Sequence, residues 1–350
     1  MMTVTARVAA FCERFGTSVP VLEAPMAGAC PPELAAAVAN AGGMGANGVV
    51  LDGPAKIADW VSRFRTMSDG ALQLNIWLPD EPVDAPDRVA AATAFLETFG
   101  SPGADAEGPD FDAQCEAMLE AAPTVVSSIM GLFPPEYVTR LHERGIAWFA
   151  CATTLADALA AQEAGADAVV AQGMEAGGHR GTFDPATAEA TTVGLMALVP
   201  RFADALDVPV VAAGGIADGR GVAAALALGA SAVQVGTALL RSPEAGIDAE
   251  WAKSLDGLGP EHTTPTRAYS GRLGRAIATP FVQAWAADGG PRPAPYPQQR
   301  RLVGRFRRGG AESVDRVNMW AGQSAALARA EPAGEIVTRM WSDARAILSL

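Results

Sequence analysis

Lysine and histidine are scarce in this chain of 350 residues. The two lysines are Lys56 and Lys253, and the three histidines are His142, His179 and His262. Both lysines fall in helix-like segments, away from the ends of the β-rich runs. Schiff-base aldolases and pyridoxal enzymes need a lysine at the reacting centre, so the sequence argues against both classes. The shortage also leaves few candidates for a side chain that transfers a proton.

Cysteine is equally rare. The four cysteines are Cys12, Cys30, Cys115 and Cys151. They form no CxxC unit and none stands at zinc-ligand spacing from a histidine, so we expect reduced thiols and no metal site. Arg7, Glu13 and Arg14 interrupt the N-terminal segment, which argues against a secretory signal. Since no apolar run approaches the roughly 18 residues of a membrane helix, we expect a cytoplasmic protein without a membrane partner.

Positive charge is also in short supply. The chain has 26 Lys and Arg residues against 39 Asp and Glu residues, a formal net charge of −13. This balance argues against a protein whose affinity comes from phosphate-backbone contacts, so we expect no nucleic-acid partner. A hydrophobic share of 49% is enough for a sizeable core. The oligomeric state is left open, a homo-oligomer included.

What the chain does have is a regular alternation of β-rich runs and Ala-rich helical stretches. Alternating strands and helices predict parallel βαβ units, and near-continuous hydrophobic strands are typical of a sheet covered on both faces. The strands are expected at 19–26, 45–50, 72–78, 125–130, 146–152, 168–172, 208–213 and 232–235. Eight such strands predict an α/β fold of the TIM (β/α)8 barrel type.

Two stretches break the alternation and predict insertions that form a small cap or second domain. We expect residues 1–79 to form the first part of the barrel, 80–112 to contribute to the cap, and 113–243 to complete the barrel strands. Residues 244–312 would form the rest of the second domain. The segment 313–350 has a helical pattern and is expected to supply C-terminal helices that close on the barrel.

A GxGxxG string occurs at Gly43, Gly45 and Gly48. A dinucleotide site needs this string after a strand and before a helix. Here it follows a predicted helix and opens a predicted strand, so we reject a Rossmann site.

Glycine-containing turns at the ends of the last two predicted strands are more informative. Gly214 and Gly215 end one strand, and Gly236 with Thr237 ends the next. In barrels, the loops after strands seven and eight commonly bind phosphate through backbone N–H groups, and glycine lets the backbone approach closely. The sequence therefore predicts a phosphate site there.

His179 is the best-placed candidate for catalysis. It lies in a Gly-rich loop after a predicted strand, where barrel active sites lie, and an ordinary pKa of about 6.5 suits proton transfer near neutrality. His142 has the pattern of a surface helix residue, and His262 has no visible partner. Glu175 could orient His179 or accept backbone hydrogen bonds. Cys30 could face a pocket, with reduced structural thiol as the simpler interpretation.

Four segments of the chain together resemble the nitronate monooxygenase family, formerly called 2-nitropropane dioxygenases. They are APMAGACPPELAAAVANAGGMG at 24–45, QGMEAGGHRGTF at 172–183, the segment 208–240 and TRAYSGRLGRA at 266–276. Arg180 after the histidine is similar to the bacterial nitronate-oxidising class. Leu273 and Gly274 alter the usual SGRxAR form, and Ile76 and Trp77 follow Asn75, so substrate size is left open.

The resemblance implies an FMN enzyme that oxidises alkyl nitronates with O2 to a carbonyl compound and nitrite, through a flavin semiquinone. Propionate 3-nitronate is the implied substrate class. His179 would face the isoalloxazine ring and remove the α-proton of neutral nitroalkanes. The implied cofactor contacts are Met26, Asn75, Gln172, Gly177, Gly178, Gly214, Gly215, Gln234, Val235, Gly236 and Thr237. Whether an arginine binds the substrate carboxylate is left open.

Two other interpretations compete with this one. The first is a related FMN reductase that uses NADH and acts on a quinone or an enoyl thioester. The second is a barrel that only binds a phosphorylated ligand.

Overall fold

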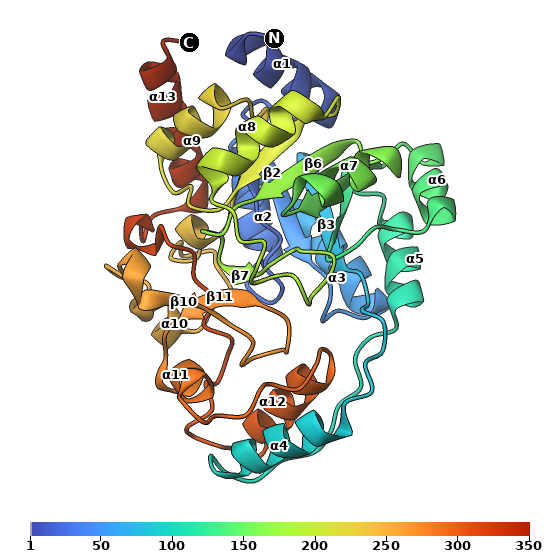
Figure 1. Ribbon diagram of the computed structural model, residues 1–350. Helices are drawn as coiled ribbons and strands as arrows, with labels where there is room; N and C mark the ends of the chain where they lie inside the picture. The colour runs from blue at the N-terminus through green and yellow to red at the C-terminus, as the bar shows by residue number, and fades with distance from the viewer. Residues whose placement is uncertain (1) are drawn as a thin grey trace.

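Eight parallel strands form a closed barrel in the computed structural model, which describes residues 2–350. The strands follow one another in chain order, and β9 returns to β1, where Gln234 pairs with Leu22. Helices surround them, as Figure 1 shows. The barrel strands are β1 (Val21–Glu23), β2 (Met44–Gly48), β3 (Ala71–Trp77), β4 (Val125–Ile129), β5 (Ala147–Ala152), β6 (Ala168–Gln172), β8 (Val210–Ala213) and β9 (Ala232–Val235). The predicted TIM barrel is therefore confirmed.

The covering helices begin where the sequence supplies a helix start. Proline stands in the first turn of α2, α3 and α6, where its missing N–H costs nothing. The covering helices are α2 (Pro32–Asn40), α3 (Pro54–Met67), α5 (Phe111–Ala121), α6 (Pro135–Glu143), α7 (Leu155–Glu163), α8 (Leu195–Ala205) and α9 (Gly219–Ala227). The remaining gap, between α9 and α2, is filled by α13 (Ala333–Leu348), which packs against both.

The N-terminal end of the barrel is closed by aromatic side chains. Helix α1 (Val4–Phe15) places Phe11 and Phe15 against Phe149 inside the barrel, with ring centroids 4.7 Å apart for Phe15 and Phe149. Each buried ring contributes about 1.5–3 kcal/mol of burial free energy. This end of the barrel is thus a packed core, and the cavity described below lies at the opposite end.

A second, smaller domain lies at the C-terminal ends of the strands, in the lower part of Figure 1. Its sheet has the order β10 (Thr263–Thr266), β11 (Gly274–Ile277), β7 (Gly178–His179). Its helices are α4 (Pro86–Glu97), α10 (Ala249–Ser254), α11 (Pro280–Ala286) and α12 (Gln298–Arg308). Leu96 of the first insertion packs with Phe281 and Phe306 of the second in one hydrophobic cluster. Residues of the two insertions therefore share one hydrophobic core, while the division of the chain into domains remains a prediction.

The structure corrects one expectation about the C-terminal segment. Helix α13 covers only Ala333–Leu348, and residues 313–332 are irregular apart from the short η3 (Ala325–Leu327). This stretch packs closely against the barrel loops, because a Cβ on Gly322 would lie 2.9 Å from the carbonyl oxygen of Glu175. A residue with a side chain at position 322 would therefore clash with this carbonyl. The stretch instead lines the cavity.

Two other expectations can be checked. Gly43 follows α2, and Gly45 and Gly48 lie inside β2, so the rejection of a Rossmann site is confirmed. Among residues 2–350, no helix is both long and apolar enough to cross a membrane.

Candidate active site

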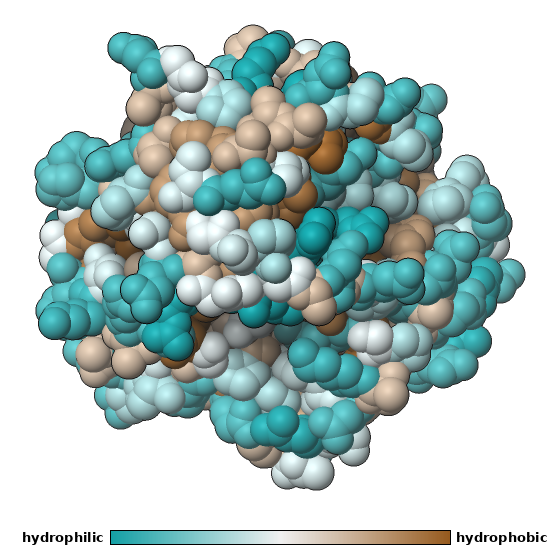
Figure 2. All heavy atoms as spheres, turned by 90° about the horizontal axis from the view of Figure 1, so that it is seen from below, coloured by the Kyte–Doolittle hydropathy of each residue, from teal (hydrophilic) through white to brown (hydrophobic). Residues whose placement is uncertain are grey.

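A cavity of about 230 Å³ lies at the C-terminal ends of the barrel strands, beneath the second domain. Figure 2 views the molecule from the side of that domain, where hydrophilic side chains cover much of the surface and hydrophobic atoms show between them. The cavity brings together the predicted site residues Met26, Asn75, Gln172, Gly177, Gly178, His179, Gly214, Gly215, Gln234, Gly236 and Thr237. Val235 does not line it, because successive residues of a strand face opposite sides and its side chain packs into the outer core.

Uncharged polar side chains on β3, β4 and β9 line the cavity and are joined by hydrogen bonds. Gln73 donates through Nε2 to the Ser127 hydroxyl at 2.7 Å, and Asn75 donates through Nδ2 to the same oxygen at 2.9 Å. Gln234 donates through Nε2 to Oε1 of Gln73 at 3.3 Å. Buried polar groups that are bonded in this way are held in fixed orientations. The network can offer amide donors and acceptors to a ligand without placing a charge beneath it.

Gln172 has a different role from the other predicted amides. Its Nε2 donates to the carbonyl oxygen of His179 at 2.9 Å, and its Oε1 accepts from the N–H of Gly181 at 2.8 Å. Both ends of the amide are therefore engaged by the segment that carries His179. Gln172 fixes the position of this segment at the end of β6.

The imidazole of His179 is buried, with 8% of the residue exposed. It lies between the indoles of Trp77 and Trp320, with ring centroids at 4.4 and 4.6 Å. Burial, followed by the positive charges of Arg300 and Arg272, lowers the pKa of His179 to about 3. The ordinary pKa assumed from the sequence is therefore wrong for this environment. The side chain is neutral throughout the physiological pH range.

The hydrogen bonds around Ser270 favour one tautomer of this neutral ring. The hydroxyl oxygen of Ser270 lies 2.7 Å from His179 Nε2, 3.2 Å from the backbone N of Arg272 and 3.3 Å from the carbonyl oxygen of Arg272. A hydroxyl has one hydrogen to donate and can accept two. All three contacts are satisfied when Ser270 donates to the carbonyl and accepts from both nitrogens. Nε2 then carries the proton, and Nδ1 is free to accept one.

The Gly-rich turns at the other side of the cavity present backbone donors. Gly214 and Gly215 have positive φ angles of 113° and 70°, which glycine adopts without strain. Within residues 2–350, the N–H groups of Gly214, Gly215, Gly236 and Thr237 donate to no protein acceptor, while all four residues line the cavity. The described lining near these turns holds no lysine or arginine. An anion there would be bound by backbone N–H groups.

Formal charge is almost absent from the cavity. Of the described residues that line it, Arg300 is the one with a formal charge, and no carboxylate is among them. The guanidinium carbon of Arg300 lies 5.8 Å from the centroid of the Trp77 ring, a cation–π distance. Lys56 and Lys253 lie on α3 and α10, away from the cavity lining. The site is thus suited to a small anionic ligand.

The remaining candidates from the sequence have structural roles. Glu175 accepts from the N–H of Leu195 at 2.9 Å and so caps α8, which decides between the two roles considered for it. The Cys30 thiol is buried, and burial together with the neighbouring Glu23 raises its pKa. His142 is at the surface, as predicted, and His262 is also exposed. No group of three or more metal-ligating side chains is present in residues 2–350.

Sequence reasoning did not single out several side chains of the cavity. Gln73, Ser127, Ser270, Trp320 and Arg300 all line it. A signal existed for Gln73, which is two residues before Asn75 and therefore on the same face of β3. Ser270 lies within the fourth motif. Trp320 and Arg300 come from irregular or distant segments, where no periodic pattern places a side chain.

Comparison with known proteins identifies the family of this chain. The family model described as nitronate monooxygenase matches residues 9–343. A nitronate monooxygenase of Paraburkholderia phytofirmans is 38% identical over 93% of this chain and 92% of its own length. One from Pseudomonas aeruginosa is 37% identical over 96% and 99%.

Solved structures show the same likeness. A nitroalkane oxidase from Streptomyces ansochromogenes has a TM-score of 0.89 at 33% identity and covers 97% of this chain and 99% of its own. FabK from Thermotoga maritima has a TM-score of 0.75 at 28% identity, with 97% of each chain covered. The family match spans nearly the whole chain and includes every barrel strand. This chain therefore belongs to the nitronate monooxygenase family of flavin-dependent oxidoreductases.

Proposed function

We propose that this chain is an FMN-dependent nitronate monooxygenase that uses O2 to convert alkyl nitronates to a carbonyl compound and nitrite. Propionate 3-nitronate, a nitronate with a carboxylate, is the proposed substrate class. The observation that carries the proposal is a cavity with a neutral buried histidine and a single arginine, His179 and Arg300, and without a carboxylate among its described lining residues. A negatively charged substrate meets attraction there and no like charge.

The residues present fit FMN. Gln73, Asn75 and Gln234 offer amide groups that match the carbonyl and N–H groups along the pyrimidine edge of a flavin ring. The unpaired N–H groups of the 214–215 and 236–237 turns match a phosphate, in the place where barrels commonly hold one. When bound, FMN would accept electrons from the nitronate one at a time and pass them to O2.

The protein's own groups would handle the substrate's proton and charge. Nδ1 of His179 would accept the α-proton of a neutral nitroalkane and then, as an N–H, donate to the nitronate so formed. A preformed nitronate has already lost that proton, so it needs no base. Arg300 would bind the substrate carboxylate, because no other formally charged side chain is among the described residues of the lining. The indoles of Trp77 and Trp320 would keep water from the imidazole.

The test begins with the visible spectrum of the purified protein. We expect oxidised-flavin absorbance, release of FMN on denaturation, and nitrite from propionate 3-nitronate in air without NADH. A yellow protein that produces no nitrite would contradict the proposed activity. Rapid bleaching by NADH without oxygen would favour the alternative, an FMN reductase acting on a quinone or an enoyl thioester.

A further inference from the structure

We propose that Arg272 is a positioning residue for the His179–Ser270 pair, and that Asp80 in turn holds Arg272. Both residues are remote in sequence from His179, and neither lines the cavity. Their effect would be to keep the proton on Nε2 of His179 and so leave Nδ1 as the acceptor.

The guanidinium of Arg272 is fixed by a buried ion pair. Arg272 is 2% exposed and the Asp80 side chain 12%. Nε of Arg272 donates to Oδ2 of Asp80 at 2.8 Å, and Nη2 donates to Oδ1, so the contact uses both carboxylate oxygens. A bidentate pair of this kind defines the orientation of both partners. Asp80 is the first residue of the 80–112 insertion, so this pair ties the start of the second domain to its sheet.

The same arginine also holds the segment that carries His179. Its Nη1 donates to the carbonyl oxygen of Thr182 at 2.7 Å. Thr182 lies three residues after His179, and the hydroxyls of Thr182 and Thr153 are 2.8 Å apart. One guanidinium therefore connects the insertion, the histidine segment and the hairpin between β10 and β11.

The backbone of Arg272 fixes the serine hydroxyl. Its N–H donates to Ser270 Oγ, and its carbonyl oxygen accepts from it. Gly271 between them has a φ of 87°, and a Cβ there would lie 2.3 Å from the carbonyl oxygen of Ala294. Only glycine fits at this position of the turn. If the guanidinium is released, the turn can shift. The Ser270 hydroxyl can then rotate and donate its hydrogen bond to Nε2 of His179 instead of to the Arg272 carbonyl.

The experiment reads the tautomer of His179 directly. Protein with ¹⁵N-labelled histidine is examined by long-range ¹H–¹⁵N correlation spectra, in which protonated and unprotonated ring nitrogens are well separated. His142→Gln and His262→Gln variants assign the other two signals. The test variant is Asp80→Asn, which keeps the shape and removes the charge, with Arg272→Lys as a second variant. This measurement needs neither turnover nor a substrate, so its outcome is separate from that of the nitrite assay.

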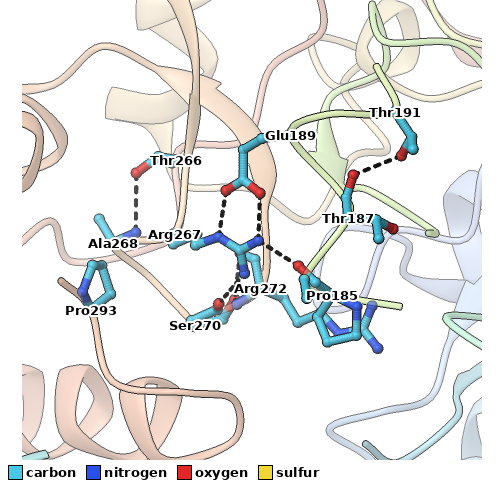
Figure 3. Close-up of polar contacts among 12 residues, drawn as sticks. Pro185, Thr187, Glu189, Thr191, Thr266, Arg267, Ala268, Ser270, Arg272 and Pro293 are labelled. Carbon is cyan, nitrogen blue, oxygen red and sulfur yellow. Dashed lines mark hydrogen bonds and ion pairs between the residues drawn. The ribbon is translucent and has the colours of Figure 1, made fainter. Parts of the chain in front are cut away.

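Glu116→Gln is the matched control. Glu116 accepts from Nη1 and Nη2 of Arg140 at 2.6 and 2.5 Å, so it also binds an arginine through both carboxylate oxygens. This pair joins α5 to α6, among the helices that cover the barrel. Glu189 is unsuitable as a control. Figure 3 shows Glu189 bound through both oxygens to Arg267, and Arg267 also donates through Nη1 to the carbonyl oxygen of Gly271, next to Ser270.

We expect a single Nε2–H form of His179 in the wild type and in Glu116→Gln. Asp80→Asn and Arg272→Lys should lose the single form and show the Nδ1–H form as well. Asp80→Glu keeps the carboxylate, so it should retain more of the single Nε2–H form than Asp80→Asn does. The proposal is overturned if the wild type is already Nδ1–H, if both test variants keep the single form, or if the control shifts as much as they do.

Discussion

The hydroxyl of Ser270 lies 2.7 Å from Nε2 of His179, across 91 residues of sequence. This contact joins the turn between β10 and β11 to the residue proposed as the base. It also determines which imidazole nitrogen is left to react. Loss of the hydroxyl should therefore affect proton removal more than electron transfer.

Ser270→Ala should lower kcat for a neutral nitroalkane about 10-fold, since a positioned base contributes about 10²–10⁴-fold and the variant disturbs only its orientation. His179→Asn should remove most of that contribution. Both variants should turn over preformed nitronate within about 3-fold of the wild type, because no proton is removed from it. Parallel steady-state assays with nitroethane and ethylnitronate would measure this. Equal losses on both substrates would show that His179 is not acting as the base.

The activity on neutral nitroalkanes should be insensitive to pH on the acid side. The active form of the base is the neutral imidazole. Because burial lowers the pKa of His179 to about 3, kcat/KM should stay level between about pH 8 and about pH 5, whereas an ordinary histidine would lose activity below about pH 6.5. A pH–rate profile measured with nitroethane tests this. An acid limb near the ordinary value, absent in His179→Asn, would show that the ring is accessible to water.

Arg300→Gln should raise KM for propionate 3-nitronate by about 10- to 100-fold, as expected for loss of a charge-assisted hydrogen bond worth about 1.5–3 kcal/mol. KM for ethylnitronate, which has no carboxylate, should change little. The control is Arg301→Gln on the same helix, whose arginine pairs with Asp105 at the surface. If both nitronates weaken equally, Arg300 does not bind the carboxylate.

Gly236→Val should weaken FMN binding. Even the first carbon of a side chain at this position would lie 3.2 Å from Sδ of Met26 and 3.3 Å from Cβ of Ala24, so these neighbours must move, and the two methyl groups of valine extend beyond that carbon. We expect an increase of at least about 10-fold in the Kd of FMN, equal to about 1.4 kcal/mol, in titrations of the apoprotein. Gly53→Ala, where no neighbouring atom lies within 4 Å, is the control. Unchanged affinity in Gly236→Val would place the phosphate elsewhere.

Glu23 should make the fold less stable at high pH. Burial raises the pKa of this carboxyl from 4.5 to about 8. A raised pKa in the folded state gives stability that is complete below the unfolded value and is lost as the pH rises through the folded value. Glu23→Gln should therefore raise Tm relative to the wild type at about pH 9 and not at about pH 5. Thermal unfolding followed by circular dichroism would measure the difference, and an identical shift at both pH values would contradict the assignment.

The barrel could be predicted because most of its strands are short, hydrophobic and followed by a helix. The pattern is local, so each strand–helix unit can be recognised from neighbouring residues in the sequence. The second domain is different. Its sheet pairs β11 with β7, and Gly274 faces His179 although the two are far apart in sequence. Such pairing depends on which segments the barrel brings together, and no local sequence pattern predicts it.

The candidate site follows the same division. All but one of the predicted site residues line the cavity, since they occur at strand ends or in the loops that follow, and only Val235 is turned away. The chemistry of His179 could not be predicted. Its low pKa arises from enclosure by Trp77 and Trp320, and Trp320 comes from a stretch whose helical pattern proved wrong. The charge balance of the whole chain likewise gave no sign of the lone Arg300.

The strand β7 contains His179, and it belongs to the sheet of the second domain rather than to the barrel. Ser270, Arg300 and Trp320 also come from outside the barrel strands, whereas Asn75 and Gln234 lie on them. Exchange of the second domain between family members should therefore change substrate specificity and the surroundings of the histidine together. The barrel strands would stay the same, and evolution could change the enzyme through substitutions in the second domain alone.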